Sequence, residues 1–344
     1  MQSNLQTMEA FLIEVSRREK EKADYFVPTN KSLMVLDENE PKLELERLGS
    51  FGLTELAHRQ IADRLNIPKK YYDRMMKVAP ELLLSNVNNW LQTEPENRLV
   101  RTMDGKIRAY LSDRYKEMDN FFVMSAFLPT LKQHQDLMVM SHSLTDNRMY
   151  IQFQFPKLRG EVKVGDTVTA GIVITNSEVG LGALDIREMI WRLSCSNGMI
   201  TSSLKRSTHL GGNIGYEVYY SQDTMEKRRM ALQGELKDVF SNAITQASFD
   251  KKLIELRQAT KDVIENRPTE FIKKVVRKFS LSETDGENVL LNMYKEGNLN
   301  RYGLINGVTY LSHGTENRDK QFEFESMAND IIELKPSEWK VLAA

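Results

Sequence analysis

The sequence predicts an α+β fold, with a mixed or antiparallel curved sheet, flanking helices and a mainly helical C-terminal part. Alternating runs and runs rich in β-branched residues, which are typical of strands, concentrate before residue 222. After that position the apolar residues recur at helical spacing. The dipeptide Asp104-Gly105 separates two alternating runs and therefore indicates a β-hairpin. We expect residues 1–222 to form an α+β core domain and residues 223–344 a mainly helical region.

The first hundred residues alternate between helical and strand-like patterns. Thr54 is the expected N-cap of one helix, because its hydroxyl can accept a hydrogen bond from the first helical turn. Pro80 is expected to break a longer helical pattern into two pieces. The predicted elements are, in order, a helix over residues 5–22, strands over 31–36 and 42–46, a helix over 54–66 and a helix from Pro68 towards Trp90.

Strand patterns dominate the middle of the chain and helical patterns the rest. The middle elements are a hairpin of 98–103 and 106–111, a helix over 118–134, a second hairpin of 137–144 and 148–155, strands over 167–175 and 183–193, and a loop over 202–215. The later helices are expected from Thr224 through Val263 and over 271–279, 287–295 and 302–311.

Composition narrows the class of protein. With 344 residues, 41% hydrophobic and 28% charged, the chain is typical of a soluble globular protein. A net charge of -1 means that any nucleic-acid surface must be a local basic patch. The single cysteine, Cys195, permits no intrachain disulfide and suits a reducing cytoplasm. No apolar run approaches the roughly 20 residues of a membrane span, and no signal-peptide pattern opens the sequence. We therefore expect a cytoplasmic protein without a membrane partner.

The sequence contains no catalytic motif, so we expect no enzyme activity, no cofactor and no resident metal. Gly160 and Gly165 have the spacing of a phosphate loop, but Asp166 stands where the phosphate-binding lysine belongs. One cysteine and five scattered histidines give no pair at zinc-ligand spacing. Cys195 follows an apolar strand and is more typical of a buried structural thiol than of a nucleophile.

Basic and aromatic residues gather near strand ends, which favours a surface for single-stranded nucleic acid. Arginine and lysine neutralise phosphates, and tyrosine offers a plane on which a base can stack. A solvated β face crossed by salt bridges would give the same pattern, so that alternative stays open. The basic run Lys273–Lys278 could extend a binding groove or form a solvated helix face. The candidate nucleic-acid-binding residues are Arg98, Arg101, Lys106, Arg108, Tyr110, Arg114, Tyr115, Arg192, Lys205 and Arg206.

Short motifs between residues 45 and 225 occur in a characteristic order. They are Phe51-Gly-Leu-Thr-Glu-Leu-Ala, Leu65-Asn-Ile-Pro68, Arg108-Ala-Tyr-Leu-Ser-Asp-Arg-Tyr115, Val164-Gly-Asp166, Asn176-Ser-Glu-Val-Gly180 and Arg192-Leu-Ser-Cys-Ser-Asn-Gly-Met199. In this order they resemble a family of phage and plasmid proteins known as the domain of unknown function number nine-three-two. The segment from Tyr302 to His313 is similar to the family's closing segment. The resemblance implies a mobile-element origin and a bacterial host cytoplasm, but no particular activity.

Three hypotheses follow from the sequence. The first is a phage or plasmid DNA-metabolism protein that binds single-stranded DNA, for example in recombination or annealing, and that forms a homo-oligomer. The second is an interaction protein that inhibits a host defence or repair enzyme. The third is a metal-dependent nuclease, which would require Asp113, Glu178 and Asp185 to converge on magnesium.

Overall fold

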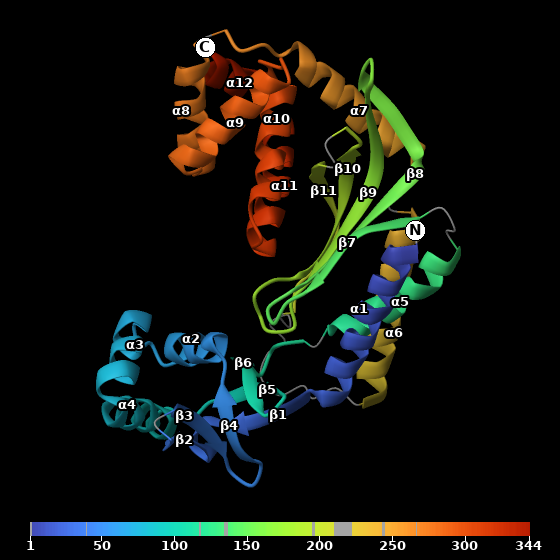
Figure 1. Cartoon of the computed structure of the whole chain (residues 1–344). Coiled ribbons are helices and arrows are strands. Elements are labelled where there is room, and N and C mark those ends of the chain that lie inside the picture. The colour runs from blue at the N-terminus through green and yellow to red at the C-terminus, as the bar shows by residue number, and fades with distance from the viewer. Residues whose placement is uncertain are drawn as a thin grey trace.

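The computed structural model describes residues 2–38, 40–116, 118–133, 137–194, 197–209, 222–242, 245–265 and 267–344. Two mixed or antiparallel sheets carry flanking helices, and a helical part follows, so the predicted α+β class is confirmed. Figure 1 shows the N-terminal sheet at one end of an elongated molecule, the C-terminal helices at the other end and the second sheet between them. Within the described ranges no helix is long and apolar enough to cross a membrane.

The N-terminal sheet has six strands in the order β1-β5-β6-β4-β3-β2. Its neighbouring strands are antiparallel except β4 and β6, which pair in parallel. Asp104 and Gly105 have φ angles of 51° and 74°, which suit the tight turn of a two-residue hairpin, so that prediction is confirmed. The strands are β1 (Ala23–Pro28), β2 (Ser32–Asp37), β3 (Glu40–Leu45), β4 (Gly49–Leu53), β5 (Asn97–Met103) and β6 (Lys106–Ser112), and a 3-10 helix, η1 (Thr29–Lys31), lies between β1 and β2.

Three helices cover one face of this sheet: α2 (Glu55–Arg64), α3 (Lys69–Val78) and α4 (Pro80–Thr93). The hydroxyl of Thr54 accepts a hydrogen bond from the backbone N–H of Ala57 at 3.2 Å, so Thr54 caps α2 as expected. Pro80 is the first residue of α4, where a missing N–H costs nothing, and the predicted interruption is confirmed. Leu43, Ile61 and Tyr110 are among the buried residues of this N-terminal core.

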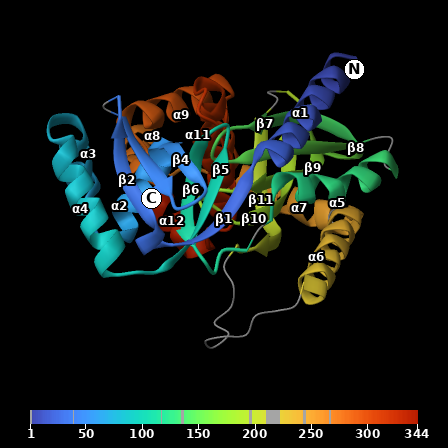
Figure 2. The same ribbon diagram turned by 90° about the horizontal axis from the view of Figure 1, so that it is seen from below.

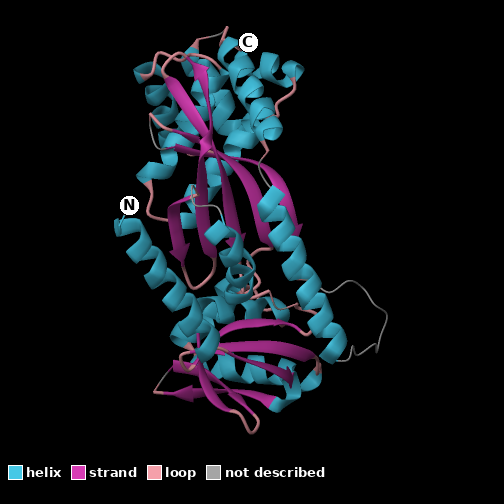
Figure 3. Ribbon diagram, turned by 90° about the vertical axis from the view of Figure 1, so that its right-hand side faces the viewer, coloured by secondary structure: helices cyan, strands magenta, loops and turns pink. Residues whose placement is uncertain are grey.

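The second sheet is an antiparallel meander in which β7 to β11 lie side by side in chain order. Its strands are β7 (Met138–Leu144), β8 (Met149–Lys163), β9 (Asp166–Asn176), β10 (Leu184–Arg192) and β11 (Asn197–Ser207). The 15 residues of β8 span about 50 Å. This length lets one end of the sheet meet the N-terminal sheet while the other end reaches the C-terminal helices (Figure 3).

Three helices that are distant from one another in sequence cover one face of the second sheet. They are α1 (Gln2–Glu21), α5 (Asn120–Gln133) and α6 (Gln222–Asn242). Phe11 of α1, Phe127 of α5 and Phe240 of α6 join Phe153 and Ile172 of the sheet in one core. Figure 2 shows α1 and α5 beside β7 and β8.

The remaining helices pack around the other end of the second sheet. They are α7 (Gln246–Lys261), α8 (Pro268–Phe279), α9 (Glu283–Lys295), α10 (Arg301–Tyr310), α11 (Arg318–Ile332) and α12 (Pro336–Ala343), with a 3-10 helix, η2 (Leu311–Gly314), after α10. Their buried side chains form one core with Val168, Ile190 and Met199 of the sheet. Residues after 222 therefore share cores with the preceding sheet, and a separate domain beginning at residue 223 stays a prediction.

Several elements differ from the sequence predictions. β11 continues to Ser207, so the loop expected over 202–215 is wrong for residues 202–207, while residues 210–221 lie outside the described part of the chain. The sequence pattern missed β1, β4, β11, α11 and α12. β4 contains two glycines, which are depleted in strands. Its strand conformation is stabilised by pairing with β3 and β6, which local sequence does not specify.

Candidate functional site

The second sheet meets the N-terminal sheet at a junction built from four segments distant in sequence (Figure 1). These segments are the end of α2, the β5–β6 hairpin with the turn after it, the β9–β10 loop and the residues after β11. Two segments with charged and polar residues near strand ends, Arg98–Tyr115 and Asn176–Gly180, come together here. The cluster around Arg192 lies at the opposite end of β10, because Arg192 pairs with Val168 and Asp185 with Thr175.

Arg101 is fully buried and is the centre of an ion-pair network. Its Nη2 atom lies 2.8 Å from a carboxylate oxygen of Asp24 and 2.7 Å from one of Asp119. Its Nη1 atom donates to the carbonyl oxygen of Glu178 at 2.8 Å. Burial disfavours the charged guanidinium, but Asp119 and Asp24 outweigh that effect and raise the pKa of Arg101. The charge of Arg101 is therefore neutralised inside the protein.

A β-bulge redirects Arg108. The register between β5 and β6 shifts beside Arg101 and leaves Arg108 facing no residue across the ladder. Arg108 instead lies 2.8 Å from a carboxylate oxygen of Glu178, with side chains 6% and 7% exposed. Tyr110 packs in the N-terminal core. Arg108 and Tyr110, both predicted to bind nucleic acid, are therefore buried.

Arg101 and Arg108 connect the N-terminal sheet to the second sheet through buried ion pairs and hydrogen bonds. Removing an ion from water costs several kcal/mol, and only close pairing with additional hydrogen bonds offsets that cost. Glu178 meets this requirement, because its second oxygen accepts the backbone N–H of Asn120 at 2.6 Å while the first binds Arg108. The network joins β1, β6, the start of α5 and the β9–β10 loop.

The expected trough of exposed cations and phenol rings is wrong for most of the predicted residues. Carboxylates of the protein neutralise several of the cations. Arg192 lies 2.7 Å from Asp166 and 2.7 Å from Glu296. Arg98 pairs with Glu96, and Lys205 with Glu235 at 2.6 Å. The buried members of the predicted set are Arg101, Arg108, Tyr110, Tyr115 and Arg192.

Three of the predicted cations remain exposed. Lys106 is the first residue of β6, at the opposite end of the strand from Ser112 and therefore away from the junction. Arg114 and Arg206 belong to segments that meet at the junction. In the described part of the chain Arg206 makes no ion pair.

A pocket with a volume of about 230 Å³ opens at the junction. The exposed guanidinium groups of Arg64 and Arg206 lie on its lining together with Tyr115, Gly180 and His209. No carboxylate within the described ranges pairs with Arg64. Gly180 has a φ angle of 82°, and a Cβ atom there would lie 2.6 Å from a methyl carbon of a neighbouring leucine, so the loop requires glycine.

The rings of Tyr115 and His209, which both belong to the lining of this pocket, are buried and stack on each other. Their centroids are 4.8 Å apart with an interplanar angle of 8°. The Tyr115 hydroxyl donates to the carbonyl oxygen of Ser177 at 2.9 Å. The His209 Nδ1 atom lies 3.0 Å from the carbonyl oxygen of Lys116, and Nε2 lies 3.1 Å from Oδ1 of Asn176. These bonds fix both rings, and burial lowers the pKa of His209, which favours its neutral form.

Sequence patterns did not identify Arg64 or His209 as site residues. A cation in the last turn of a helix is ordinary, because it interacts favourably with the helix dipole. His209 follows the end of β11, and a polar residue just after a strand is the feature of the sequence that could have pointed to it. Only the chain topology brings these two residues to the same pocket.

The acidic residues considered for magnesium do not form a site. Glu178 binds Arg108 and the N–H of Asn120, and Asp185 accepts from Arg187 at 2.8 Å. Among the described residues no group of three or more histidine, cysteine, aspartate or glutamate side chains could hold a metal ion. Cys195 lies outside the described residues.

Comparison of the chain with models of protein families, with curated proteins and with solved structures finds no match. The resemblance to the phage and plasmid family therefore stays a prediction from the sequence motifs.

Proposed function

We propose that this protein binds single-stranded nucleic acid at the junction pocket. Arg64 and Arg206 would contact phosphates, and the Tyr115–His209 pair would contact a base. The observation that carries this proposal is the convergence of two exposed guanidinium groups, neither ion-paired in the described structure, on one pocket from residues 64 and 206.

Arg64 and Arg206 differ from Arg101 and Arg108 because they make no ion pair in the described part of the chain. Arg101 and Arg108 form ion pairs with carboxylates inside the protein. A polyanion would have to break these buried ion pairs before it could bind either arginine. Arg64 and Arg206 are exposed and keep their fork of N–H donors for a phosphate. They therefore supply the electrostatic contribution that the sequence assigned to a larger cluster.

The volume of the pocket favours binding of a single nucleotide, or part of one, rather than a longer stretch of the strand. Its volume of about 230 Å³ is below the roughly 300–1,000 Å³ of typical ligand pockets. Tyr115 and His209 stack on each other and are 8% and 4% exposed, so a base would contact only the part of these rings that faces the pocket. Contact of this kind does not depend on base sequence.

A single small pocket gives limited affinity, so we propose that several copies act together on one strand. Linking weak sites along a polymer raises the overall affinity without any new contact. This arrangement agrees with the homo-oligomer expected from the sequence and with a role in phage or plasmid DNA metabolism such as recombination or annealing.

The test is the affinity of the full-length protein for a fluorescently labelled single-stranded oligonucleotide as salt is varied. We expect wild-type affinity to fall with salt and the double variant Arg64→Ala/Arg206→Ala to bind weakly. Each lost phosphate contact should reduce the magnitude of the slope of log affinity against log salt by about 0.7. The double variant loses two such contacts in each bound protein molecule, so the slope should decrease in magnitude by about 1.4 per molecule.

A matched control is Lys227→Ala, which removes an exposed cation of α6, 74% exposed and away from the junction pocket. It should leave the salt slope unchanged. Absence of oligonucleotide binding by the wild type at low salt would overturn the proposal, as would equal slopes for the double variant and the wild type.

A second candidate function is inhibition of a host defence or repair enzyme through protein contact. The observation that favours it is a set of large apolar side chains exposed on α3 and α4, with exposed fractions from 39% to 72%. A host enzyme recovered in stoichiometric amount by the wild type, but not by the double variant Val78→Asp/Leu82→Asp, would support this function. The residues concerned are Tyr71, Val78, Leu82 and Trp90.

A further inference from the structure

Helix α8 has two chemically different faces. Phe271, Ile272 and Val275 are buried in the C-terminal core. The basic run Lys273–Lys278 places its cations on the other side, where Arg277 and Lys278 are exposed. The one-sided burial explains why these cations cluster on the surface.

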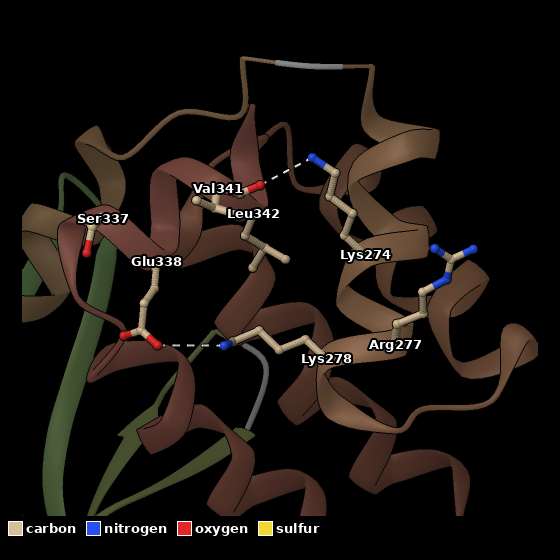
Figure 4. A pocket seen from close by; sticks show the side chains of 7 residues that line it. All are labelled: Lys274, Arg277, Lys278, Ser337, Glu338, Val341 and Leu342. Atoms are coloured by element: carbon tan, nitrogen blue, oxygen red, sulfur yellow. Dashed lines mark hydrogen bonds and ion pairs between the residues drawn. The ribbon is translucent and has the colours of Figure 1, made fainter.

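These cations border a cleft between α8 and α12 (Figure 4). Lys274, Arg277 and Lys278 come from α8, while α12 contributes Glu338, Val341 and their neighbours. The cleft has a volume of about 660 Å³, which lies within the roughly 300–1,000 Å³ of typical ligand sites. It is therefore large enough for several side chains of a partner.

The cations of the cleft are only partly neutralised. In the described structure Arg277 makes no ion pair, and Figure 4 shows its guanidinium pointing away from the other labelled side chains. Lys278 and Glu338 are 3.9 Å apart and 38% and 46% exposed, so their attraction is weak. The Lys274 ammonium donates to the backbone oxygens of Ala344 and Val341 at 2.6 and 3.2 Å, which holds it at the cleft.

Aliphatic side chains form the apolar part of the cleft. Val341 is 75% exposed, and Leu342 lies beside it on the lining. Among the described residues that line the cleft, none has an aromatic ring on which a base could stack. The combination of a basic rim and an aliphatic floor is complementary to a chain that carries both carboxylates and apolar side chains.

We propose that the α8–α12 cleft binds an acidic peptide segment of a partner protein. The carboxylates of the segment pair with Arg277 and Lys278, and an apolar side chain packs against Val341. This site is separate from the junction pocket and does not depend on nucleic-acid binding there.

The test measures binding of short fluorescently labelled peptides to the full-length protein. The probe alternates aspartate and leucine, and its controls replace aspartate by lysine or leucine by serine. We expect the Asp–Leu peptide to bind, the Lys–Leu peptide not to bind and the Asp–Ser peptide to bind more weakly. Reversing charge with Arg277→Glu/Lys278→Glu should weaken Asp–Leu binding about tenfold or more. Val341→Asp should also weaken it.

The substituted side chains are exposed, and unchanged thermal unfolding will establish that the variants fold. The double variant Arg64→Ala/Arg206→Ala should bind the peptide as the wild type does, so the two sites can fail independently. Failure of the wild type to bind the Asp–Leu peptide would overturn the proposal. So would equal binding of the Asp–Ser peptide, or affinities unchanged by the α8 substitutions. The cleft would instead be a nucleic-acid surface if an oligonucleotide displaced the peptide and if Arg277→Glu/Lys278→Glu weakened binding of that oligonucleotide.

Discussion

Replacing Glu325 by glutamine tests whether a buried carboxyl group is protonated in the folded protein at neutral pH. Glu325 lies on α11, is 8% exposed and accepts a hydrogen bond from the side-chain amide of Gln152 at 2.7 Å. Burial raises the pKa of Glu325 to about 8 from an ordinary value of 4.5, against the opposing influence of Gln152 and Arg318. The folded protein therefore keeps this carboxyl protonated at neutral pH, whereas the unfolded chain releases the proton.

The sign of the pH effect follows from proton binding. Below pH 4.5 both states hold the proton, so the contribution of the protonated carboxyl to stability is fully present. Between pH 4.5 and about 8 only the folded state holds it, so stability falls as pH rises, by about 1.4 kcal/mol per pH unit. The loss reaches about 3 kcal/mol at pH 7 and about 5 kcal/mol above pH 8.

Glutamine has nearly the same shape, can still accept from Gln152 and does not titrate. We expect Glu325→Gln to resemble the wild type near pH 4 and to be more stable than the wild type at pH 8 by several kcal/mol. Urea unfolding at a series of pH values measures this difference. Comparing variant with wild type cancels the other titrating groups, provided that they do not contact Glu325.

The exposed Glu323 lies on the same helix, and Glu323→Gln is the matched control. That variant should follow the wild-type pH curve. A constant difference between Glu325→Gln and the wild type from pH 4 to pH 9 would refute the assignment of a buried, protonated carboxyl.

Three further substitutions test the junction and the fold by chemical denaturation. Arg101→Met leaves the buried Asp119 without its guanidinium partner and should destabilise the protein by about 3–5 kcal/mol, so a loss below about 1 kcal/mol would contradict a buried ion-pair network. Gly171→Ala places a methyl group 2.4 Å from a backbone oxygen and 2.7 Å from the Trp191 ring nitrogen, and should cost about 1–3 kcal/mol; an unchanged unfolding midpoint would show that β8 and β9 have room to separate. Thr54→Ala removes the cap of α2 and should cost about 1 kcal/mol, whereas Thr54→Ser should retain most of the stability.

Local chemistry in the sequence determined much of the secondary structure. The Asp104-Gly105 turn, the Thr54 cap and the helix start at Pro80 each depend on the conformational preference of one or two residues, and each is confirmed. The alternating and β-branched runs likewise identified β7 to β10 of the second sheet, because a strand with a buried face has a period of two whatever its partner. The α+β class follows from these local patterns.

The tertiary structure alone decided which charged residues are available to a partner. Arg101 is paired with Asp24, 77 positions away in sequence, and the β-bulge turns Arg108 towards Glu178. Arg192, of the same residue type and also near a strand end, is held at the far end of the second sheet. Arg64 and Arg206 are exposed together on one pocket. Charge pairing depends on strand register and on contacts between distant segments, and the short-range periodicity of a sequence specifies neither.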